Sequence, residues 1–386
     1  MLSAEQQQLR EAMLRQCSEF SDEYWSEHDR SGEFPEDFYR AIADAGWLGI
    51  AMPSEVGGSG LGITEAAVMM QAIAESGAGM SGASAIHINI FGLNPVVVFG
   101  TEAQKQRMLP PLLSGAEKAC FAVTEANAGH NTAQISTRAE RQPDGSYRIS
   151  GDKIWTSTAQ VADKVLILAR TAPIEASKRK LDGLSLFYTE LDRSRIEVRL
   201  IHKMGRHAVD SNMLFIEDLA VPAEDLIGEA GKGFEYLLHG LNPERILIAA
   251  EAVGLGRAAI ERAARYARER VVFGRPIGQN QGIAHPLAQA WAELEAANLM
   301  VLEAARRYDA GESCGIQANA AKLLASEAAF RACERAVLTL GGMGYAQEYH
   351  VERLLRESLI PRLAPIGNQM ILNFLAEKAL DLPKSY

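Results

Sequence analysis

The segments 164–170, 184–189 and 212–217 read KVLILAR, LSLFYT and NMLFIE, and two further runs, SYRI at 146–149 and IEVRLI at 196–201, lie among them. β-Branched, aromatic and other apolar residues dominate each run, and Gly, Pro and Asp separate one run from the next. Short strands at this spacing predict a β sandwich or barrel, because βαβ units would place a helix between successive strands.

Helical periodicity flanks this stretch on both sides. Before it, the segments 5–20, 35–47, 63–76 and 104–113 carry apolar residues at helical spacing, with Gly-rich turns at 57–62 and 77–82. After Gly228 the long segments 257–271, 286–308 and 317–340 are typical of antiparallel helices in a bundle. The sequence therefore predicts an α+β protein with a helical N-terminal domain at 1–118, a middle β domain at 119–228 and a C-terminal four-helix bundle at 229–386.

Composition restricts the functional class. The 386 residues include 39 Lys and Arg against 49 Asp and Glu, which gives a net charge of −10. This balance argues against nucleic acid and against an anionic membrane surface as partners, since both need a basic face. The N-terminus is polar from residue 3 onward. No stretch is expected to approach the ~18 uncharged apolar residues of a membrane span, so we expect a cytoplasmic protein.

No residue pattern predicts a metal site or a disulfide. The four cysteines are scattered along the chain, at Cys17, Cys120, Cys314 and Cys333, and no pair has the spacing of a zinc site or a redox dithiol. None of the eight His residues pairs with Glu or another His at the spacing of metal ligands. We expect buried thiols in a reducing compartment and no bound metal.

A glycine pattern in the last third of the chain has a structural explanation. Residues 254–259 read GLGRAA, which fits a loose G-x-G-x-x-A. A dinucleotide-binding fingerprint needs a strand before it and a turn within it, whereas this pattern lies inside a helical segment. Close packing between helices through small residues accounts for it better.

The tetrapeptide Asn242-Pro243-Glu244-Arg245 has two interpretations. As structure it reads as a helix start, with Asn242 as the N-cap, Pro243 at the first helical position and Glu244 near the positive end of the helix dipole. As chemistry, Glu244 is a candidate general base, although the dipole would stabilise its anion and keep it a weak base until substrate excludes water. The spacing alone leaves both interpretations open.

Three longer stretches point to a family. The first is ACFAVTEANAG at 119–129, followed by GDKIWTS at 151–157; the second is YARERVVFGRPI at 266–277 with Gln281; the third is LGGMGY at 340–345 with EYHVER at 348–353. In this order and at these distances they resemble the FAD-dependent acyl-CoA dehydrogenases across essentially the whole chain. That family also has an α–β–α layout.

The resemblance implies FAD as the cofactor and assigns contacts to it. Phe121, Val123 and Thr124 would lie along the isoalloxazine, Trp155 would stack near it, and Ser157 would lie beside N5. Arg270, Phe273 and Gln281 would reach the adenosine diphosphate half, partly across a subunit boundary, where Leu338, Gly341 and Gly342 would form a tight turn. Gly129 and His130 would contact the cofactor or CoA; His130-Asn131 replaces the usual Ser-Asp, so His130 is either a phosphate donor or a surface histidine. The implied assembly is a homodimer, usually paired into a tetramer.

The implied reaction is α,β-dehydrogenation of an acyl-CoA thioester to the 2-enoyl-CoA. A carboxylate removes the α proton, the β hydrogen leaves as hydride to flavin N5, and an electron-transfer flavoprotein accepts the electrons. Most of the family carries the base in a late Tyr-Glu-Gly-Thr loop, where this chain has Pro365 at the Glu position. The long-chain and isovaleryl branches carry it after the middle domain, at the position of Glu244. Leu241, Asn242 and Arg245 would line the same mouth.

Pro365 is the main departure from the family. The family uses the N–H at this position to hold the thioester oxygen, and proline has no N–H. One alternative is therefore a diverged acyl-CoA flavoenzyme that does not dehydrogenate, such as a desulfinase-like lyase or a flavin monooxygenase. Another is a non-catalytic acyl-CoA- or FAD-binding protein. We expect the helices around 86–91 and 249–254 to form the pocket floor, where Ala249, Ala250 and Gly254 suggest room for a longer or branched chain.

Overall fold

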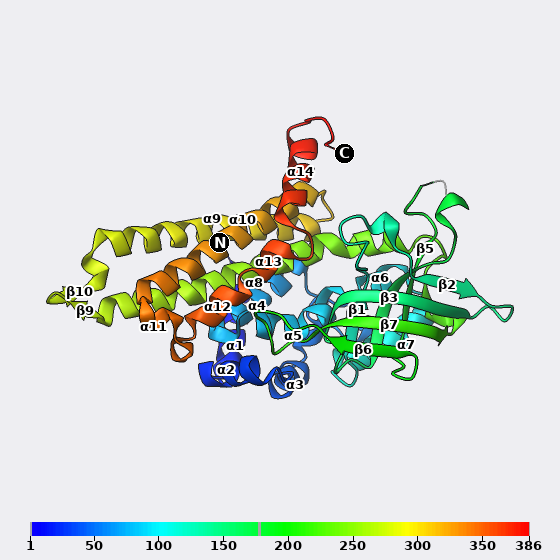
Figure 1. The fold of residues 1–386 in the computed structure, drawn as a ribbon, viewed down its shortest axis with the longest axis horizontal. Coiled ribbons are helices and arrows are strands. Elements are labelled where there is room, and N and C mark those ends of the chain that lie inside the picture. The colour runs from blue at the N-terminus through cyan, green and yellow to red at the C-terminus, as the bar shows by residue number, and fades with distance from the viewer. Residues whose placement is uncertain (1, 177–178, 386) are drawn as a thin grey trace.

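The computed structural model describes residues 2–176 and 179–385, and helices come before and after a central sheet (Figure 1). The helices before the sheet are α1 (Ala4–Cys17), α2 (Asp22–Ser31), α3 (Glu36–Asp44), α4 (Ile63–Ile73), α5 (Gly79–Phe91), α6 (Asn94–Phe99) and α7 (Glu102–Leu113). A π-helical turn at Ala74–Ala78 joins α4 to α5. Glu5 in the first turn and Arg15 in the last turn of α1 complement the helix dipole, and Ser3 caps its N-terminus.

The middle of the chain forms one sheet. Its strands are β1 (Ala119–Ala122), β2 (Arg138–Arg141), β3 (Tyr147–Ser157), β4 (Lys164–Arg170), β5 (Leu184–Glu190), β6 (Ile196–Leu200), β7 (Ser211–Val221) and β8 (Leu226–Ile227). They follow the order β6-β7-β3-β2-β4-β5-β8, and β1 pairs with β4 away from this path. Because β4 pairs with three strands, β1, β2 and β5, the sheet is branched.

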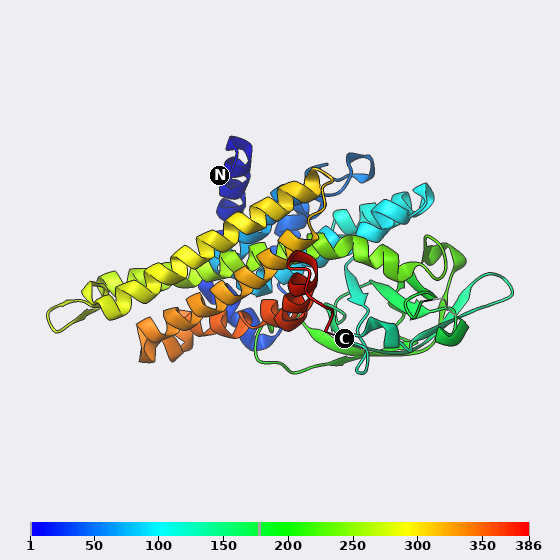
Figure 2. The ribbon, with the colours of Figure 1, turned by 90° about the horizontal axis from the view of Figure 1, so that it is seen from above.

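Long helices form the last part of the chain. They are α8 (Gly233–Glu269), α9 (Gln281–Asp309) and α10 (Gly315–Leu340), followed by α11 (Gly342–Tyr345), α12 (Val351–Glu357), α13 (Ile360–Leu363) and α14 (Asn368–Ala379). A small hairpin of β9 (Val271–Val272) and β10 (Arg275–Pro276) joins α8 to α9. Figures 1 and 2 show this hairpin at one end of the molecule and the sheet at the other. The helix–sheet–helix architecture predicted from the sequence is confirmed.

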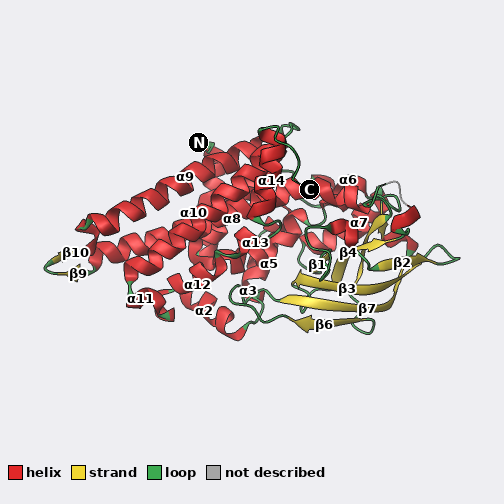
Figure 3. Ribbon diagram, turned by 45° about the horizontal axis from the view of Figure 1, so that its top comes forward, coloured by secondary structure: helices red, strands yellow, loops and turns green. Residues whose placement is uncertain are grey.

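Apolar packing joins the first and last helices into one core. Buried side chains of α1, α3, α4, α5, α8, α9 and α10 form one continuous cluster. A second cluster packs α6 and α7 against the sheet and includes Leu109 of α7 and Leu166 and Leu168 of β4. Figure 3 shows these helices next to the strands. Because α8 contributes to both clusters, it connects the sheet to the bundle.

Small residues let α8 approach its neighbours closely. A Cβ at Gly254 would lie 2.2 Å from the carbonyl oxygen of Gln71 on α4, and a Cβ at Gly256 would lie 2.5 Å from the side chain of Leu294 on α9. The glycine pattern therefore serves helix packing, as predicted. Ala249 and Ala250 are fully buried in the same core, so these small residues do not offer the pocket space that the sequence suggested.

The segment from Ile63 to Phe99 corrects one expectation. It contains α4, the π-helical turn, α5 and α6. The segment is 37 residues long and its most apolar 18-residue window has a mean hydropathy of 1.4, so it is long and apolar enough to cross a membrane. The expectation that no stretch approaches such a composition is therefore wrong. In the structure 65% of that window is buried inside the protein, which is typical of a core helix.

Candidate active site

Glu244 lies well inside α8 rather than at a helix start. The helix begins at Gly233 and includes Pro243 in its interior. The predicted N-cap at Asn242 is therefore wrong, because the helix that begins at Gly233 continues through this position. Pro243 has no N–H, so the helix lacks one backbone hydrogen bond there. Glu244 is thus away from the positive end of the helix dipole, and the dipole does not stabilise its anion.

Burial determines the acidity of Glu244. The half-buried side chain has its pKa raised to about 7 by burial, against the opposing charges of His87, Arg245 and Lys322. Its carboxyl group makes no hydrogen bond or ion pair with another described residue. A carboxylate with a pKa near neutral pH and free oxygens is suited to proton abstraction.

The three residues predicted to line the mouth lie together. Nη1 of Arg245 donates to the carbonyl oxygen of Leu241 at 3.3 Å and to Oδ1 of Asn242 at 3.2 Å. All three side chains are half-buried. They flank Glu244 on α8, and burial lowers the pKa of Arg245.

The loop containing Pro365 is fixed to α10 by a buried lysine that the sequence analysis missed. Nζ of Lys322 donates to the carbonyl oxygen of Ile366 at 2.7 Å and to Oδ1 of Asn368 at 2.9 Å. Burial lowers the pKa of Lys322 to about 8, and its charge acts on both Glu244 and Arg245. The N–H of Ile366 makes no hydrogen bond within the described part of the chain, so it is free to bind a ligand oxygen.

His130 lies at the junction of the middle domain and this loop. Its exposed ring accepts a hydrogen bond at Nε2 from the N–H of Gly367 at 3.3 Å. With Nε2 accepting, Nδ1 carries the proton of the neutral ring and remains available to a ligand oxygen. His130 thus connects two segments that both lie near the predicted cofactor.

Trp155 has an unusual backbone conformation for a bulky residue. Its φ is 61°, and a shift in the β3–β7 register falls between Lys153 and Thr156. Its side chain is 57% exposed. The N–H of Ile154 donates to the carbonyl oxygen of Thr124 at 2.9 Å, so the two predicted flavin stretches are adjacent. An exposed aromatic side chain in a strained position is typical of a ligand-contacting residue.

A buried ion pair stabilises the loop that follows β1. Nζ of Lys153 donates to Oε1 of Glu125 at 2.9 Å and to the carbonyl oxygen of Val123 at 3.0 Å. Glu125 also accepts from the N–H groups of Ser136 and Thr137. Although burial acts in the opposite direction, these partners lower the pKa of Glu125 to about 2. The loop that follows β1 is therefore held in one conformation, and the predicted residues Phe121, Val123, Thr124 and Ser157 remain half-buried at its surface.

Arg206 connects the sheet to α5, a contact that no sequence pattern indicated. Nη2 donates to the hydroxyl groups of Ser157 at 3.0 Å and Ser211 at 3.2 Å, and Nη1 donates to the hydroxyl of Ser84 on α5 at 3.1 Å. Its φ of 57° lies in the left-handed region. Burial lowers the pKa of Arg206, and its hydrogen-bond partners in the described residues are neutral serines.

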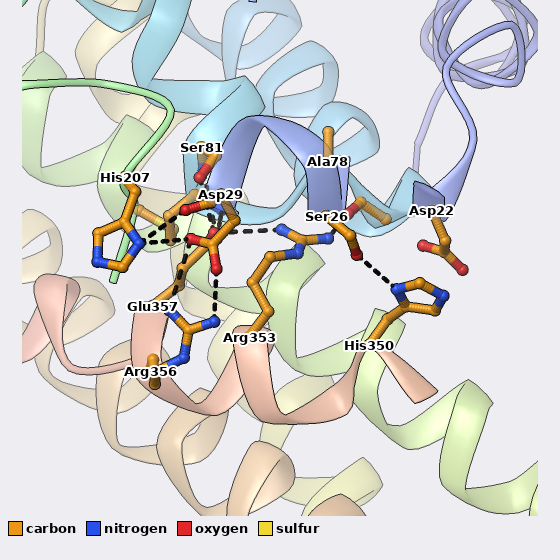
Figure 4. A network of polar contacts seen from close by, with 12 residues as sticks. Asp22, Ser26, Asp29, Ala78, Ser81, His207, His350, Arg353, Arg356 and Glu357 are labelled. Atoms are coloured by element: carbon orange, nitrogen blue, oxygen red, sulfur yellow. Dashed lines mark hydrogen bonds and ion pairs between the residues drawn. The ribbon is translucent and has the colours of Figure 1, made fainter. Parts of the chain in front are cut away.

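A polar network holds both α5 and the loop of Arg206 in place (Figure 4). The carboxylate of Glu357 on α12 accepts from the N–H and the hydroxyl of Ser81 at 3.2 and 2.7 Å, which caps the first turn of α5. Arg356 donates to the carboxylate of Asp29 at 2.5 Å. His207, the neighbour of Arg206, donates from Nδ1 to the backbone oxygen of Asp29 at 2.8 Å. The network thus joins α2, α5, α12 and the middle domain.

The other predicted cofactor residues lie far from this site. Arg270, Phe273 and Gln281 are exposed at the β9–β10 hairpin, and Leu338, Gly341 and Gly342 lie at the exposed end of α10. The hairpin follows the last turn of α8, roughly 40 Å along the helix from Glu244 at 1.5 Å per residue. Figures 1 and 2 show the hairpin at the end of the molecule farthest from the sheet. The two groups can share one cofactor only if a second chain contributes one of them.

The glycines of both groups fit an external ligand. A Cβ at Gly129, Gly341 or Gly342 would meet nothing within 4 Å, so these positions are not crowded by the chain itself. The φ of 62° at Gly341 accounts for glycine there. Open positions beside exposed aromatic residues are compatible with a flat cofactor. The four cysteines are all buried, as expected from the sequence. The described residues contain no cluster of three or more His, Cys, Asp or Glu able to hold a metal.

Comparisons with known proteins give the family. Models of the N-terminal, middle and C-terminal domains of acyl-CoA dehydrogenase match residues 3–116, 120–219 and 231–380. The chain belongs to the acyl-CoA dehydrogenase family, so it is a flavin-dependent oxidoreductase with FAD as its cofactor.

Individual relatives cover the whole chain. Acyl-CoA dehydrogenase FadE12 of Mycobacterium tuberculosis is 37% identical over 100% of this chain and 98% of its own. Butyryl-CoA dehydrogenase of Megasphaera elsdenii has a TM-score of 0.91 at 29% identity over 99% of both chains. Glutaryl-coenzyme A dehydrogenase in complex with glutaryl-CoA has a TM-score of 0.92 at 29% identity, over 100% of this chain and 97% of that one. The fold is therefore that of an acyl-CoA dehydrogenase.

Proposed function

We propose that this chain oxidises an acyl-CoA thioester to the 2-enoyl-CoA, with Glu244 as the general base. The observation that carries the proposal is the state of Glu244, whose carboxyl group is half-buried, has a pKa of about 7 and has no partner among the described residues. Pro365 occupies the place of the usual base and cannot accept a proton. The missing carboxylate at 365 and the available one at 244 are complementary.

In this mechanism the chain binds the thioester and moves one proton. Arg245 and Asn242 hold the CoA side of the substrate at the mouth, and Glu244 takes the α proton. Binding of the acyl group removes water from Glu244, which raises its pKa further and favours the transfer. The N–H of Ile366 donates to the thioester oxygen in place of the N–H that Pro365 lacks, and stabilises the negative charge that develops there. FAD, when bound, supplies the acceptor for the β hydrogen.

The FAD site would be shared between two chains. One chain contributes Phe121, Val123, Thr124, Gly129, His130, Trp155 and Ser157, and the partner contributes Arg270, Phe273, Gln281, Leu338, Gly341 and Gly342. The exposure of the hairpin group and the separation of the two groups within one chain support this arrangement. The exposed apolar residues at the hairpin end, among them the fully exposed Phe273, favour a homo-oligomer because large apolar patches mark interfaces.

The electron acceptor and the cellular location follow from relatives and composition. The subunit CarC of Acetobacterium woodii, named as part of a caffeyl-CoA reductase–Etf complex, is 33% identical over 88% of this chain. This supports an electron-transfer flavoprotein as the acceptor. We also propose that the protein is cytoplasmic.

Anaerobic flavin absorbance tests the proposed reaction. The purified holoenzyme is titrated with straight and branched saturated acyl-CoAs, and loss of the oxidised flavin band is expected with some of them. A yellow protein that binds these ligands without bleaching would instead favour a lyase or monooxygenase, for which Pro365 is the supporting feature. A protein that binds acyl-CoA or FAD without any turnover would be the non-catalytic alternative.

A further inference from the structure

The guanidinium group of Arg206 carries a positive charge that no described carboxylate contacts. Its hydrogen bonds go to three serine hydroxyl groups, and its buried Nε makes none within the described residues. Three carboxylates attract it from a distance, those of Glu357, Asp210 and Glu251. Each of the three also has another cation beside it: Arg353 for Glu357, His87 for Glu251 and Lys203 for Asp210. Because a charge without a contacting counter-ion is costly to bury, a positive charge kept here indicates a function that needs it.

The three serines come from three elements, and they differ in exposure. Ser157 at the end of β3 and Ser211 at the start of β7 are cross-strand partners, and Ser84 lies on α5. Ser84 and Ser211 are buried, whereas Ser157 is half-buried. Nη2 of Arg206 donates to the hydroxyl of Ser157 at 3.0 Å. Through this hydroxyl the guanidinium group acts on the surface of the candidate site.

The contact also determines the direction in which Ser157 can donate a hydrogen bond. Since Oγ of Ser157 accepts from Arg206, the hydroxyl hydrogen must point toward another acceptor. Within the described part of the chain this hydroxyl donates to no residue. Its hydrogen is therefore free to bind an acceptor atom of a ligand.

The backbone around the contact adopts an uncommon conformation. Trp155, Thr158 and Arg206 have φ angles of 61°, 69° and 57°. Residues other than glycine rarely occupy this left-handed region, and a β-branched residue such as Thr158 is a clear outlier there. Such strain persists only where the surrounding structure holds it, and it is concentrated at ligand sites. Because Ser157 lies between Trp155 and Thr158, the fold fixes its position before any ligand binds.

We propose that Arg206 is a positioning residue for the flavin: it holds the hydroxyl of Ser157 as a hydrogen-bond donor to N5 and thereby raises the reduction potential of FAD. The proposal rests on the function proposed above, in which Ser157 belongs to the cofactor group. In that reaction the bond between the β carbon and its hydrogen breaks, the hydrogen moves to N5 with both electrons, and the α proton goes to Glu244. The flavin therefore gains one negative charge. A hydroxyl donor polarised by a guanidinium group favours this gain in a partly buried site.

The midpoint potential of the flavin tests the proposal without any acyl-CoA. The holoenzyme is reduced anaerobically with xanthine and xanthine oxidase beside a redox dye, in the wild type and in Arg206→Met, which removes the charge and keeps an unbranched side chain. The equilibrium constant of two-electron reduction should fall by about tenfold or more in the variant, because hydrogen bonds from charged groups contribute at this level. This fall lowers the midpoint potential by about 30 mV. Arg195→Met, at an exposed position before β6, should keep the wild-type potential.

The variant Ser157→Ala tests whether the effect passes through the hydroxyl group. Ser157→Ala alone should also lower the midpoint potential. Arg206→Met should then lower the potential by less in the Ser157→Ala background than in the wild type, because residues that act as a unit have non-additive effects. The FAD content and the melting temperature of each variant are measured alongside. A merely structural role of Arg206 would change these two quantities and leave the potential unchanged.

Two results would overturn the proposal. One is a wild-type midpoint potential in a folded, flavin-loaded Arg206→Met, and the other is an equal effect of Arg206→Met with and without the Ser157 hydroxyl. If Arg206→Met does not retain FAD, Arg206→Gln, which keeps a neutral donor, decides by the same measurement. If no acyl-CoA reduces the flavin but the potentials shift as expected, the proposed reaction fails and the role of Arg206 stands.

Discussion

Glu244 illustrates how burial sets chemistry at the scale of one residue. The sequence predicts it as the base through the resemblance and through Pro365, but it also predicts a helix start that does not exist. Asn-Pro-Glu is a common N-terminal pattern, and here tertiary packing extends the helix across the proline. The residues that tune the site, Lys322 and Arg206, could not be predicted, because their partners are distant in sequence.

The pKa of Glu244 predicts the pH dependence of flavin reduction. Burial raises this pKa from 4.5 to about 7, and only the ionised carboxylate accepts a proton. Because acyl-CoA binding removes water from Glu244 and raises its pKa further, the limiting rate of flavin reduction should rise with pH from about 7 upward. Stopped-flow reduction by a saturating acyl-CoA between about pH 5.5 and about pH 8.5 measures this rate. A rate that is constant over this range would be incompatible with Glu244 as the base.

Lys322 allows a second prediction at this scale. In Lys322→Met the buried donors to Ile366 and Asn368 disappear, and the N–H of Ile366 is no longer fixed toward the substrate. Hydrogen bonds to charged groups contribute about 1.5–3 kcal/mol, so flavin reduction should slow by about tenfold or more. Lys180→Met, at an exposed position, is the control. A wild-type rate of flavin reduction in Lys322→Met would show that the loop of Pro365 and Ile366 has no part in the mechanism.

At the scale of elements, prediction succeeds where a segment is a continuous run of apolar residues that becomes buried. The strands at 164–170 and 184–190 match the predicted runs to within one residue. β1, β2 and β8 were not predicted, since periodicity is weak over so few residues. α2 was not predicted either, because its sequence is mostly polar and only Trp25 and Asp29 are buried. The Gly-rich segment at 77–82 was predicted as a turn. Gly77 and Gly79 do break the helix, with φ of 111° and 62°, but the residues after Gly79 belong to α5. Gly82 permits contact with Trp25, whose ring would lie 3.0 Å from a Cβ there. The domain boundaries at 118 and 228 remain predictions.

The packing of α8 on α4 predicts a stability difference between two glycines. In Gly254→Ala the new Cβ would meet the backbone oxygen of Gln71 at 2.2 Å, and overpacking of this kind lowers the free energy of unfolding by about 1–3 kcal/mol. Gly282→Ala in α9 meets nothing within 4 Å and should raise stability by up to about 1 kcal/mol through helix propensity. Denaturant unfolding compares the two variants. Equal stability of both would contradict the close approach of α8 and α4.

At the scale of the whole molecule, the two predicted groups of cofactor residues lie far apart in one chain. The resemblance placed them on one cofactor, partly across a subunit boundary. In one chain the structure places the hairpin group at the end of the helical bundle and the other group where the sheet meets α5 (Figure 1). The resemblance already implied a subunit boundary between these contacts, and the separation of the two groups within one chain supports it. A shared site makes assembly and FAD binding interdependent.

Phe273 provides the test of this dependence. In Phe273→Asp a charge replaces a fully exposed aromatic ring at the hairpin, so the monomer fold should be unaffected while the interface and the cofactor contact are lost. Sedimentation velocity should show a smaller species, and the flavin-to-protein absorbance ratio should fall. An oligomer with full flavin content would place the interface elsewhere.

The most direct measurement of the central claim is anaerobic reduction of the flavin in Glu244→Gln. The substitution keeps the size of the side chain and removes its basicity. We predict that the variant retains FAD and binds the acyl-CoA that bleaches the wild type, but that its oxidised flavin band persists on mixing. Bleaching of the variant at the wild-type rate would contradict the assignment of Glu244 as the base, and with it the proposed mechanism.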